Sequence, residues 1–118
     1  MTAYSHLFVH VADLERTRAF YVGTLGLEVL LEREGYVRVG GGGGFHIGFE
    51  AGDAAHIGST GIEIVIRVDD VDEAYDRFRA AGVVFDSAPE DQPWGARHAW
   101  LHDPDGYRLS IWSPVVTA

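Results

Sequence analysis

The sequence predicts an α+β fold made of two tandem βαβββ modules within a single domain of residues 1–118. Three observations support this prediction. A strand-like alternation of apolar residues followed by a helix-like periodicity occurs twice, and each copy continues into β-prone segments separated by turn residues. The two copies also align, with Leu7, Val9, Val11, Asp13 and Leu14 matching Ile64, Ile66, Val68, Asp70 and Val71. We expect module one at 4–50, a linker at 51–60 and module two at 61–114.

The first module begins with a strand over 6–11, whose odd-numbered residues share one face and whose even-numbered residues share the other. Asp13 has the acceptor side chain of a helix N-cap, and apolar residues follow at helical spacing from Leu14 to Leu25. Gly26 then ends this helix. Strands are expected over 27–32, 36–39 and 45–49, with the glycine run 40–44 as a flexible connection between the last two.

The second module repeats this order. A strand is expected over 63–68, and Asp70 with Glu73 forms the capping box of a helix that ends before Gly82. Residues 83–85 are expected to form the next strand and residues 87–95 a long loop. Pro104 and Gly106 then suit a tight turn over 103–106, which predicts a hairpin between the last two strands.

Each helix should cover one face of its sheet and leave the other face open. We therefore expect a curved mixed sheet around a concave cleft, with the helices on the outside. Strand parity places eleven residues toward this cleft: His6, Phe8, His10, His46, Gly48, Glu63, Val65, Arg67, Arg108, Ser110 and Trp112. Parity also places Phe45, Ile47, Leu109 and Ile111 under the helices. His98, Trp100 and His102 share one face, but the sequence leaves open which face it is.

Composition narrows the function. The formal net charge is −9, from 18 acidic and 9 basic residues, which disfavours nucleic acid and favours a cationic or neutral ligand. The chain has no cysteine, so disulfides and thiolate sites are excluded. No apolar stretch is long enough to span a membrane, and no signal peptide precedes the first strand. We expect a soluble cytoplasmic protein that does not bind membranes.

Two motifs carry a resemblance to a known family. Asp13, Phe20-Tyr21 and Leu25-Gly26-Leu27 in the first module, with Asp103-Pro104-Asp105-Gly106 near the end of the second, are similar to the vicinal oxygen chelate superfamily. This superfamily includes glyoxalase I, extradiol dioxygenases, fosfomycin-resistance enzymes and bleomycin-resistance proteins. The resemblance covers nearly the whole chain and implies the paired-module fold. It also implies a homodimer whose cleft joins one module from each chain.

In metal-dependent members of that superfamily the ligands come from the first and last strands of the modules. The resemblance places His6, His46, Glu63 and Ser110 at those positions. Such members usually carry glutamate where this chain has Ser110, and a neutral hydroxyl is a poor ligand for a divalent cation. Two imidazoles and a carboxylate still have the composition of a facial triad, so an enzyme holding one Ni, Co, Fe, Mn or Zn ion at His6, His46 and Glu63 is the alternative. These side chains also fit polar residues that line a wet cavity.

Residues 91–95, Asp-Gln-Pro-Trp-Gly, resemble the bleomycin-resistance branch, whose members bind a drug in a cleft and perform no chemistry. The resemblance and the aromatic residues favour a metal-independent protein without cofactor that sequesters an aromatic or cationic compound such as an antibiotic. Whether the protein is an enzyme stays open, and no catalytic residue is identified. The residues expected to bind the ligand are Phe8, His10, Arg67, Trp94, His98, Trp100, Arg108, Ser110 and Trp112.

Overall fold

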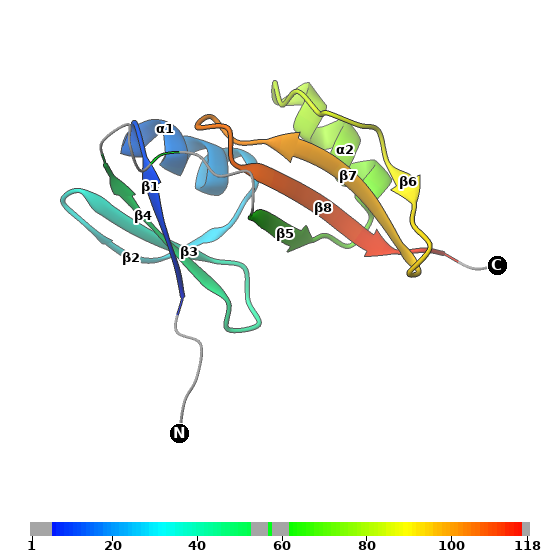
Figure 1. The fold of residues 1–118 in the computed structure, drawn as a ribbon, viewed down its shortest axis with the longest axis horizontal. Coiled ribbons are helices and arrows are strands. Elements are labelled where there is room, and N and C mark those ends of the chain that lie inside the picture. Colours follow the sequence, from blue (N-terminus) through cyan, green and yellow to red (C-terminus); the bar gives the residue numbers. More distant parts are fainter. Residues whose placement is uncertain (1–5, 53–56, 58–61, 117–118) are drawn as a thin grey trace. The chain divides into compact units, whose positions relative to one another are not determined.

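The computed structural model describes residues 6–52, 57 and 62–116, and its chain divides into two compact units, Met1–Gly58 and Ser59–Ala118 (Figure 1). Each unit contains a four-stranded mixed sheet and one helical segment in the order βαβββ. The predicted α+β class is therefore confirmed. Of the expected linker, residues 53–56 and 58–60 lie outside the described residues.

The first unit has the strand order β1-β4-β3-β2, in which β1 runs parallel to β4 and the other pairs are antiparallel. A β-bulge between Val29 and Leu31 shifts the register of β2 against β3. The elements are β1 (Leu7–Val11), α1 (Leu14–Arg18), η1 (Ala19–Thr24), β2 (Glu28–Arg33), β3 (Tyr36–Gly40) and β4 (His46–Ala51).

The second unit has the equivalent order, β5-β8-β7-β6, with β5 parallel to β8. Its strands β7 and β8 form the long C-terminal hairpin, drawn in orange and red in Figure 1. The elements are β5 (Glu63–Arg67), α2 (Val71–Ala80), β6 (Glu90–Asp91), β7 (Ala96–His102) and β8 (Arg108–Pro114). The two units thus share one topology, as the internal repeat in the sequence indicates.

Both predicted N-caps are present. The Asp13 side chain accepts a hydrogen bond from the backbone N–H of Arg16 at 3.2 Å. The Asp70 side chain accepts bonds from Asp72 N and Glu73 N at 3.0 and 3.3 Å. Glu73 does not complete the predicted capping box, because its carboxylate pairs instead with Arg77 one turn later, at 2.6 Å. Each helix therefore begins with an N-cap carboxylate that accepts backbone N–H bonds, and the return bond that Glu73 would add in a capping box is not made.

The first helix differs from the regular helix predicted from Leu14 to Leu25. After α1 the chain widens into the π-helix η1, and Leu25 N donates to Phe20 O at 2.9 Å. Two causes are visible in this segment. Val22, Gly23 and Thr24 are all poor helix formers, and the fully buried Tyr21 packs against Phe49 with ring centroids 4.5 Å apart. Tertiary packing of Tyr21 therefore overrides regular helical spacing.

Strand parity is confirmed for most of the residues placed under the helices. Ile47, Leu109 and Ile111 are buried, whereas Phe8 and Val65 on the opposite faces are 45% and 50% exposed. The prediction for Phe45 was wrong, since this residue is 59% exposed. β4 begins only at His46, because three preceding glycines with positive φ, Gly42 to Gly44, keep the chain in a turn up to Phe45.

The strand predicted over 83–85 was also wrong. Phe85 makes only an isolated bridge to Leu101, and Val84 is 83% exposed. The chain leaves strand geometry here because Asp86 N and Ser87 N both turn toward Trp100 O, at 2.8 and 3.3 Å. The fourth strand of the sheet is β6, which lies inside the segment predicted to be a loop.

The predicted C-terminal turn is present and fixes the alignment of β7 with β8. Gly106 has φ +87°, and its N–H donates to Asp103 O at 3.0 Å. The buried Asp103 side chain accepts bonds from Asp105 N and Tyr107 N, both at 2.9 Å. This acceptor closes the turn in one conformation, so the pairing between the two strands has a single register.

Gly48 is expected to be sensitive to substitution, because a Cβ there would lie 2.3 Å from Tyr36 Oη and 2.9 Å from Cζ. Tyr36 is only 6% exposed, so its ring would have to move. We expect G48A to lower the free energy of unfolding in urea by about 1–3 kcal/mol. G23A, at a helical position with open space, should be neutral or stabilising by up to about 1 kcal/mol. Equal stability of G48A and wild type would contradict this packing.

Candidate functional site

The cross-strand register of the second unit brings its predicted ligand-binding residues onto one face of the sheet. This face is exposed at Val65 and Arg108, while the alternate residues Leu109 and Ile111 are buried on the helix side. The register therefore shows that His98, Trp100 and His102 share the open face, which the sequence left undecided. The rows that cross β7, β8 and β5 are His98–Trp112–Arg67, Trp100–Ser110–Val65 and His102–Arg108–Glu63.

Three rings on this face form what we call the aromatic stack: Trp100, His98 and Trp112. The His98 ring lies nearly parallel to both indoles, with centroids 5.1 Å from Trp100 and 6.0 Å from Trp112 and interplanar angles of 14° and 15°. His98 is buried, whereas the two tryptophans are each partly exposed. The stack therefore presents tryptophan surface to solvent around a central imidazole.

Trp94 joins the stack from the turn between β6 and β7. Gly95 has φ +88° and donates to Gln92 O at 3.1 Å, which folds the segment back on itself. Trp94 Nε1 then donates to His98 Nε2 at 3.3 Å, with the two rings at 71°. Trp94 itself is 65% exposed. The local turn thus places a large apolar surface beside the stack.

A guanidinium group lies over each end of the stack. Arg108 Cζ is 5.6 Å from the Trp100 ring centroid, and Arg67 Cζ is 5.1 Å from that of Trp112. Both distances are within the range of cation–π attraction. The local charge of this face therefore differs from that of the whole chain, because two arginines accompany one acidic group, Glu63, in the three rows.

Glu63 is the polar centre of the face. Its carboxylate accepts hydrogen bonds from Trp100 Nε1 at 2.8 Å and from Ser110 Oγ at 3.4 Å, and it pairs with Arg108 Nε at 3.2 Å. Ser110 is fully buried beneath it. Glu63 thus orients the Trp100 ring and holds the Arg108 side chain in place.

His98 is held in its neutral form. Burial lowers the pKa of His98, and the negative charge of Glu63 opposes this shift. Because Trp94 donates to Nε2, that nitrogen is unprotonated and the ring proton is on Nδ1. Nδ1 is buried and has no hydrogen-bond partner among the described residues. The imidazole therefore serves in the stack as an uncharged ring.

The open face of the first unit carries a different set of contacts. Phe8 stacks on Tyr36 at 6.4 Å and meets His10 edge-on at 5.1 Å. Arg38 Nε donates to Tyr36 Oη at 2.9 Å. The register pairs Phe8 and Arg38 with Gly48, so Tyr36 lies across the glycine. Phe8 and His10, both predicted to bind the ligand, are thus part of this ring cluster.

The three predicted metal ligands belong to different units: His6 and His46 to the first, Glu63 to the second. His6 is exposed just before β1, and His46 is the first residue of β4. Within each unit, the described residues include no group of three or more His, Asp or Glu side chains arranged to hold a metal ion. The set formed by His6, His46 and Glu63 stays a prediction.

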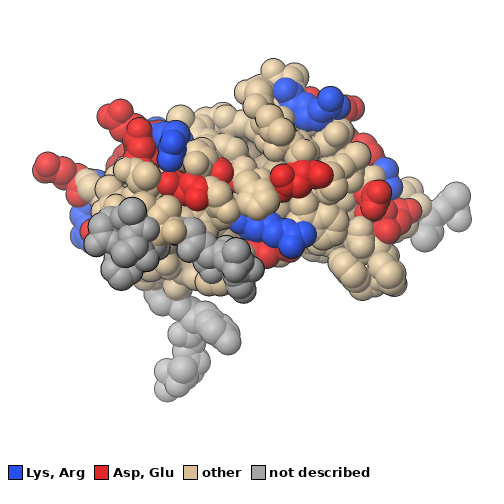
Figure 2. All heavy atoms as spheres, turned by 45° about the horizontal axis from the view of Figure 1, so that its top comes forward, with Lys and Arg blue, Asp and Glu red and all other residues tan. Residues whose placement is uncertain are grey.

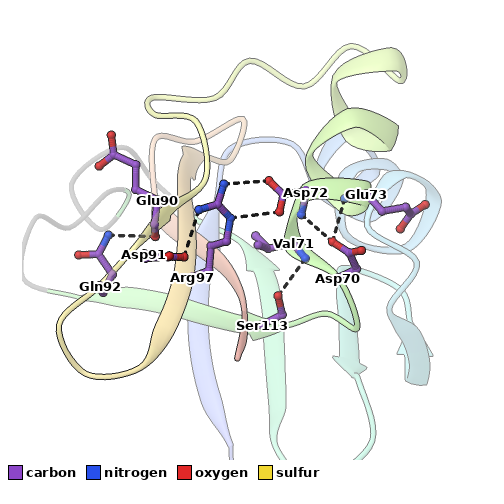
Figure 3. Close-up of polar contacts among 9 residues, drawn as sticks. All are labelled: Asp70, Val71, Asp72, Glu73, Glu90, Asp91, Gln92, Arg97 and Ser113. Carbon is purple, nitrogen blue, oxygen red and sulfur yellow. Dashed lines mark hydrogen bonds and ion pairs between the residues drawn. The ribbon is translucent and has the colours of Figure 1, made fainter. Parts of the chain in front are cut away.

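A hollow in this unit, of about 350 Å³, was not predicted from the sequence. Arg97, on the helix side of β7, bridges Asp72 at 3.1 Å and Asp91 at 3.1 Å, and these bonds raise its pKa (Figure 3). Ser113 Oγ accepts a bond from Val71 N at 3.0 Å. These groups are paired with one another, so the network ties β6, β7 and α2 together. In the sequence, this network could have been indicated only by strand parity, since Arg97 and His98 are neighbours on one strand and must point to opposite faces of the sheet.

On the face drawn in Figure 2, carboxylates lie beside arginines within each unit. The chain has no lysine, so all nine basic residues are arginines. Among the described helices, none has the length and apolar character needed to cross a membrane.

The fold and this arrangement of residues can be compared with known proteins. A model of the Glyoxalase/Bleomycin resistance protein/Dioxygenase superfamily matches residues 3–111. The chain belongs to this superfamily. Membership confirms the resemblance drawn from the Phe20-Tyr21 and Asp103 to Gly106 motifs, and it establishes the paired-module fold.

Members of the superfamily that resemble this chain differ in what they do. TnmS3, an antibiotic-binding protein from Streptomyces sp. CB03234, is 27% identical, with a TM-score of 0.82 over 98% of both chains. A bleomycin-binding protein complexed with bleomycin is also 27% identical, with a TM-score of 0.70 over 97% of this chain and 100% of the other. A probable lactoylglutathione lyase of Vibrio cholerae is 28% identical over 90% of this chain and 86% of its own length.

A protein of Mycobacterium bovis, Mb0911c, is 39% identical over 59 residues, which is 50% of this chain and 39% of that relative. The chain therefore spans well under two thirds of this relative's length. Superfamily membership fits both binding proteins and a lyase. Membership alone therefore does not distinguish ligand binding from lyase chemistry, and the distinction has to come from the residues of the site.

The neutral state of His98 predicts a pH effect on stability. Below the pKa of about 6.5 that an unfolded histidine has, the unfolded chain gains a proton before the folded chain does. The free energy of unfolding should therefore fall between about pH 7.5 and 5.5 more steeply in wild type than in H98Q. Urea unfolding at several pH values measures this. Equal slopes in wild type and H98Q would show that His98 does not stay neutral.

Proposed function

We propose that this protein binds and sequesters a small planar aromatic compound, such as an antibiotic, without a metal ion or chemical conversion. One observation carries the proposal: the aromatic stack of Trp100, His98 and Trp112, joined by Trp94, on the open face of the second unit. Large rings held in fixed positions supply apolar contact and stacking, which are the main sources of affinity for flat ligands.

The stack is fixed before any ligand arrives. Glu63 holds the Trp100 indole by its N–H, and the Trp94 indole holds His98. Little rotamer freedom then remains to be lost on binding, which favours affinity. Trp94 is 65% exposed, so its ring offers apolar surface to a flat guest beside the stack while its N–H holds His98. Rings that are both held in place and exposed therefore suit a protein that binds and sequesters a flat compound.

Charge on this face favours an aromatic guest over a cationic one. Guanidinium groups lie over both ends of the stack, where they would repel a second cation. The formal charge of −9 is a property of the whole chain and is spread over surface carboxylates such as Asp72, Glu73 and Asp91. For this face we therefore propose an aromatic ligand and no longer expect a cationic one.

Similarity to TnmS3 and to the bleomycin-binding protein supports this proposal, since both are described as binding an antibiotic. We extend the proposal to a cytoplasmic homodimer, an extension that rests on the composition and on the family resemblance. Sedimentation of the purified chain tests the dimer, and a species of 12.9 kDa would refute it.

Binding should be visible with a panel of fused-ring aromatic antibiotics, followed by intrinsic tryptophan fluorescence, by melting temperature and by calorimetry. We expect at least one compound to quench the fluorescence and to raise the melting temperature. W112A should weaken its binding about tenfold or more, while W112F, which keeps a ring, should retain most of the affinity. The proposal would be abandoned if no compound in the panel changed fluorescence or melting temperature.

A metal-dependent enzyme is the second candidate, and its similarity to a probable lactoylglutathione lyase favours it. In that case His6, His46 and Glu63 would hold a divalent ion that supplies Lewis-acid chemistry to a substrate with adjacent oxygens. The contacts of Glu63 oppose it, because Trp100, Ser110 and Arg108 already donate to this carboxylate. A metal ion would have to replace these donors.

Metal analysis separates the two candidates. For protein purified without chelator we expect far less than one ion per chain, and no change in melting temperature on adding nickel, cobalt, iron, manganese or zinc. E63Q should lower stability because it weakens the bonds to Trp100 and Arg108. A stoichiometric ion that is lost in both H46Q and E63Q would contradict the metal-independent binding protein and favour the metal-dependent enzyme.

A further inference from the structure

We infer that the ligand of the aromatic stack carries an anionic oxygen group beside its planar ring, and that Arg67 binds this group. The inference rests on the proposed function and adds the chemical class of the ligand. It depends on the position of Arg67, on the pairing of the other arginines and on the charges nearby.

Arg67 is placed by the sheet register at the edge of the aromatic stack. It is the last residue of β5 and lies directly opposite Trp112 on β8. Its guanidinium lies over the indole, with Cζ 5.1 Å from the ring centroid, and the residue is exposed. Contact with the ring positions the flat guanidinium and leaves N–H donors at its edge available.

Arg67, on β5, differs from the arginines of the neighbouring strands β7 and β8. Arg97 is bonded to Asp72 and Asp91, and Arg108 is paired with Glu63. Arg67 has neither an ion pair nor a hydrogen bond to any described residue. Since a guanidinium stays protonated at all physiological pH values, this charge persists beside the stack, and no carboxylate of the described residues pairs with it.

The acidic groups near Arg67 are directed elsewhere. Glu63, on the same strand and face, is occupied by Trp100, Ser110 and Arg108. Asp69 lies beyond the end of β5 and lines the hollow around Arg97. Glu90, on β6, lies opposite His98 of β7 in the register and three strand spacings from Arg67, which is about 14 Å and longer than the screening length of about 8 Å at physiological salt. An anionic group on the ligand would be the nearest partner for Arg67.

The chemistry of the partner follows from the shape of the donor. A guanidinium presents parallel N–H groups that match a carboxylate, and it binds an ionised phenol through a single charge-assisted bond. The neighbouring tryptophan requires a flat apolar group next to that oxygen. The ligand class is therefore a planar aromatic acid, either a ring carboxylate or a ring with an ionised hydroxyl.

Three naphthalenes of the same ring system test the inference by calorimetry: 2-naphthoate, 2-naphthamide and (2-naphthyl)trimethylammonium. Wild type should bind the carboxylate at least about tenfold more tightly than the amide and should bind the ammonium compound most weakly. R67Q should bind carboxylate and amide equally, and R67K, which keeps charge without the planar fork, should recover part of the preference. Added salt should reduce the preference in wild type.

Arg79 provides the matched control. It too has no ion pair among the described residues and lies over an aromatic ring, with Cζ 5.0 Å from the Tyr75 centroid, but it is on α2. R79Q should keep the wild-type preference, and the melting temperature of each variant reports its folding. Equal binding of the carboxylate and the amide by wild type, or a preference that survives in R67Q, would overturn the role of Arg67 and leave the proposed function intact. No binding of any naphthalene would count against both.

Discussion

The register between β7 and β8 is the constraint on which the candidate site depends. Side chains alternate along a strand, so a slip of β8 by one residue would send Ser110 and Trp112 under the helix and bring Leu109 and Ile111 to the open face, away from Trp100 on β7. The Asp103 turn prevents this slip, because one carboxylate oxygen accepts two backbone N–H groups and Gly106 adopts the left-handed conformation that closes the turn. A polar group buried at the turn thus determines which aromatic residues can meet, although none of them contacts it.

Glu63 makes the resulting face a preformed site. The Glu63 carboxylate is exposed, and three donors fix its position: an indole N–H, a hydroxyl and a guanidinium. Ser110 is essential to this arrangement, since a second carboxylate at that position would face Glu63 without a proton or a cation between them. The hydroxyl that makes the position a weak metal ligand is thus also what lets Glu63 act as an acceptor for Trp100 and Arg108.

Much of the fold could be predicted because it is encoded in local patterns. The N-caps Asp13 and Asp70, the turn at Gly106 and the alternation of the strands each depend on residues close in sequence. The failures have a common cause. Both expectations followed local patterns, namely β-propensity for the strand at Val84 and strand parity for Phe45 under the helix, whereas backbone bonds to Trp100 and a glycine turn decided the structure.

For the site, the sequence predicted its members but not their contacts. Arg67, Trp94, His98, Trp100, Arg108, Ser110 and Trp112 were all expected to bind ligand, and the structure places them together on or beside one face of the second unit. That Trp94 donates to His98, and that Glu63 pairs with Arg108, depends on side-chain directions between separate strands and a turn. Alternation alone carries no information on such pairs.

The duplication itself explains why the two open faces are not equivalent as binding surfaces. In the aligned registers, Gly48 of the first unit corresponds to Ser110 of the second, and Tyr36 corresponds to His98. Tyr36 lies across the glycine and is held by Arg38, so the first face covers its own centre with a ring that is 6% exposed. In the second unit the hydroxyl of Ser110 supports Glu63 instead, and the tryptophans around His98 stay partly exposed. The same backbone therefore yields one self-covered face and one face with a fixed aromatic surface and a guanidinium, that of Arg67, which pairs with no described carboxylate; the proposed planar acid depends on these features of the second face.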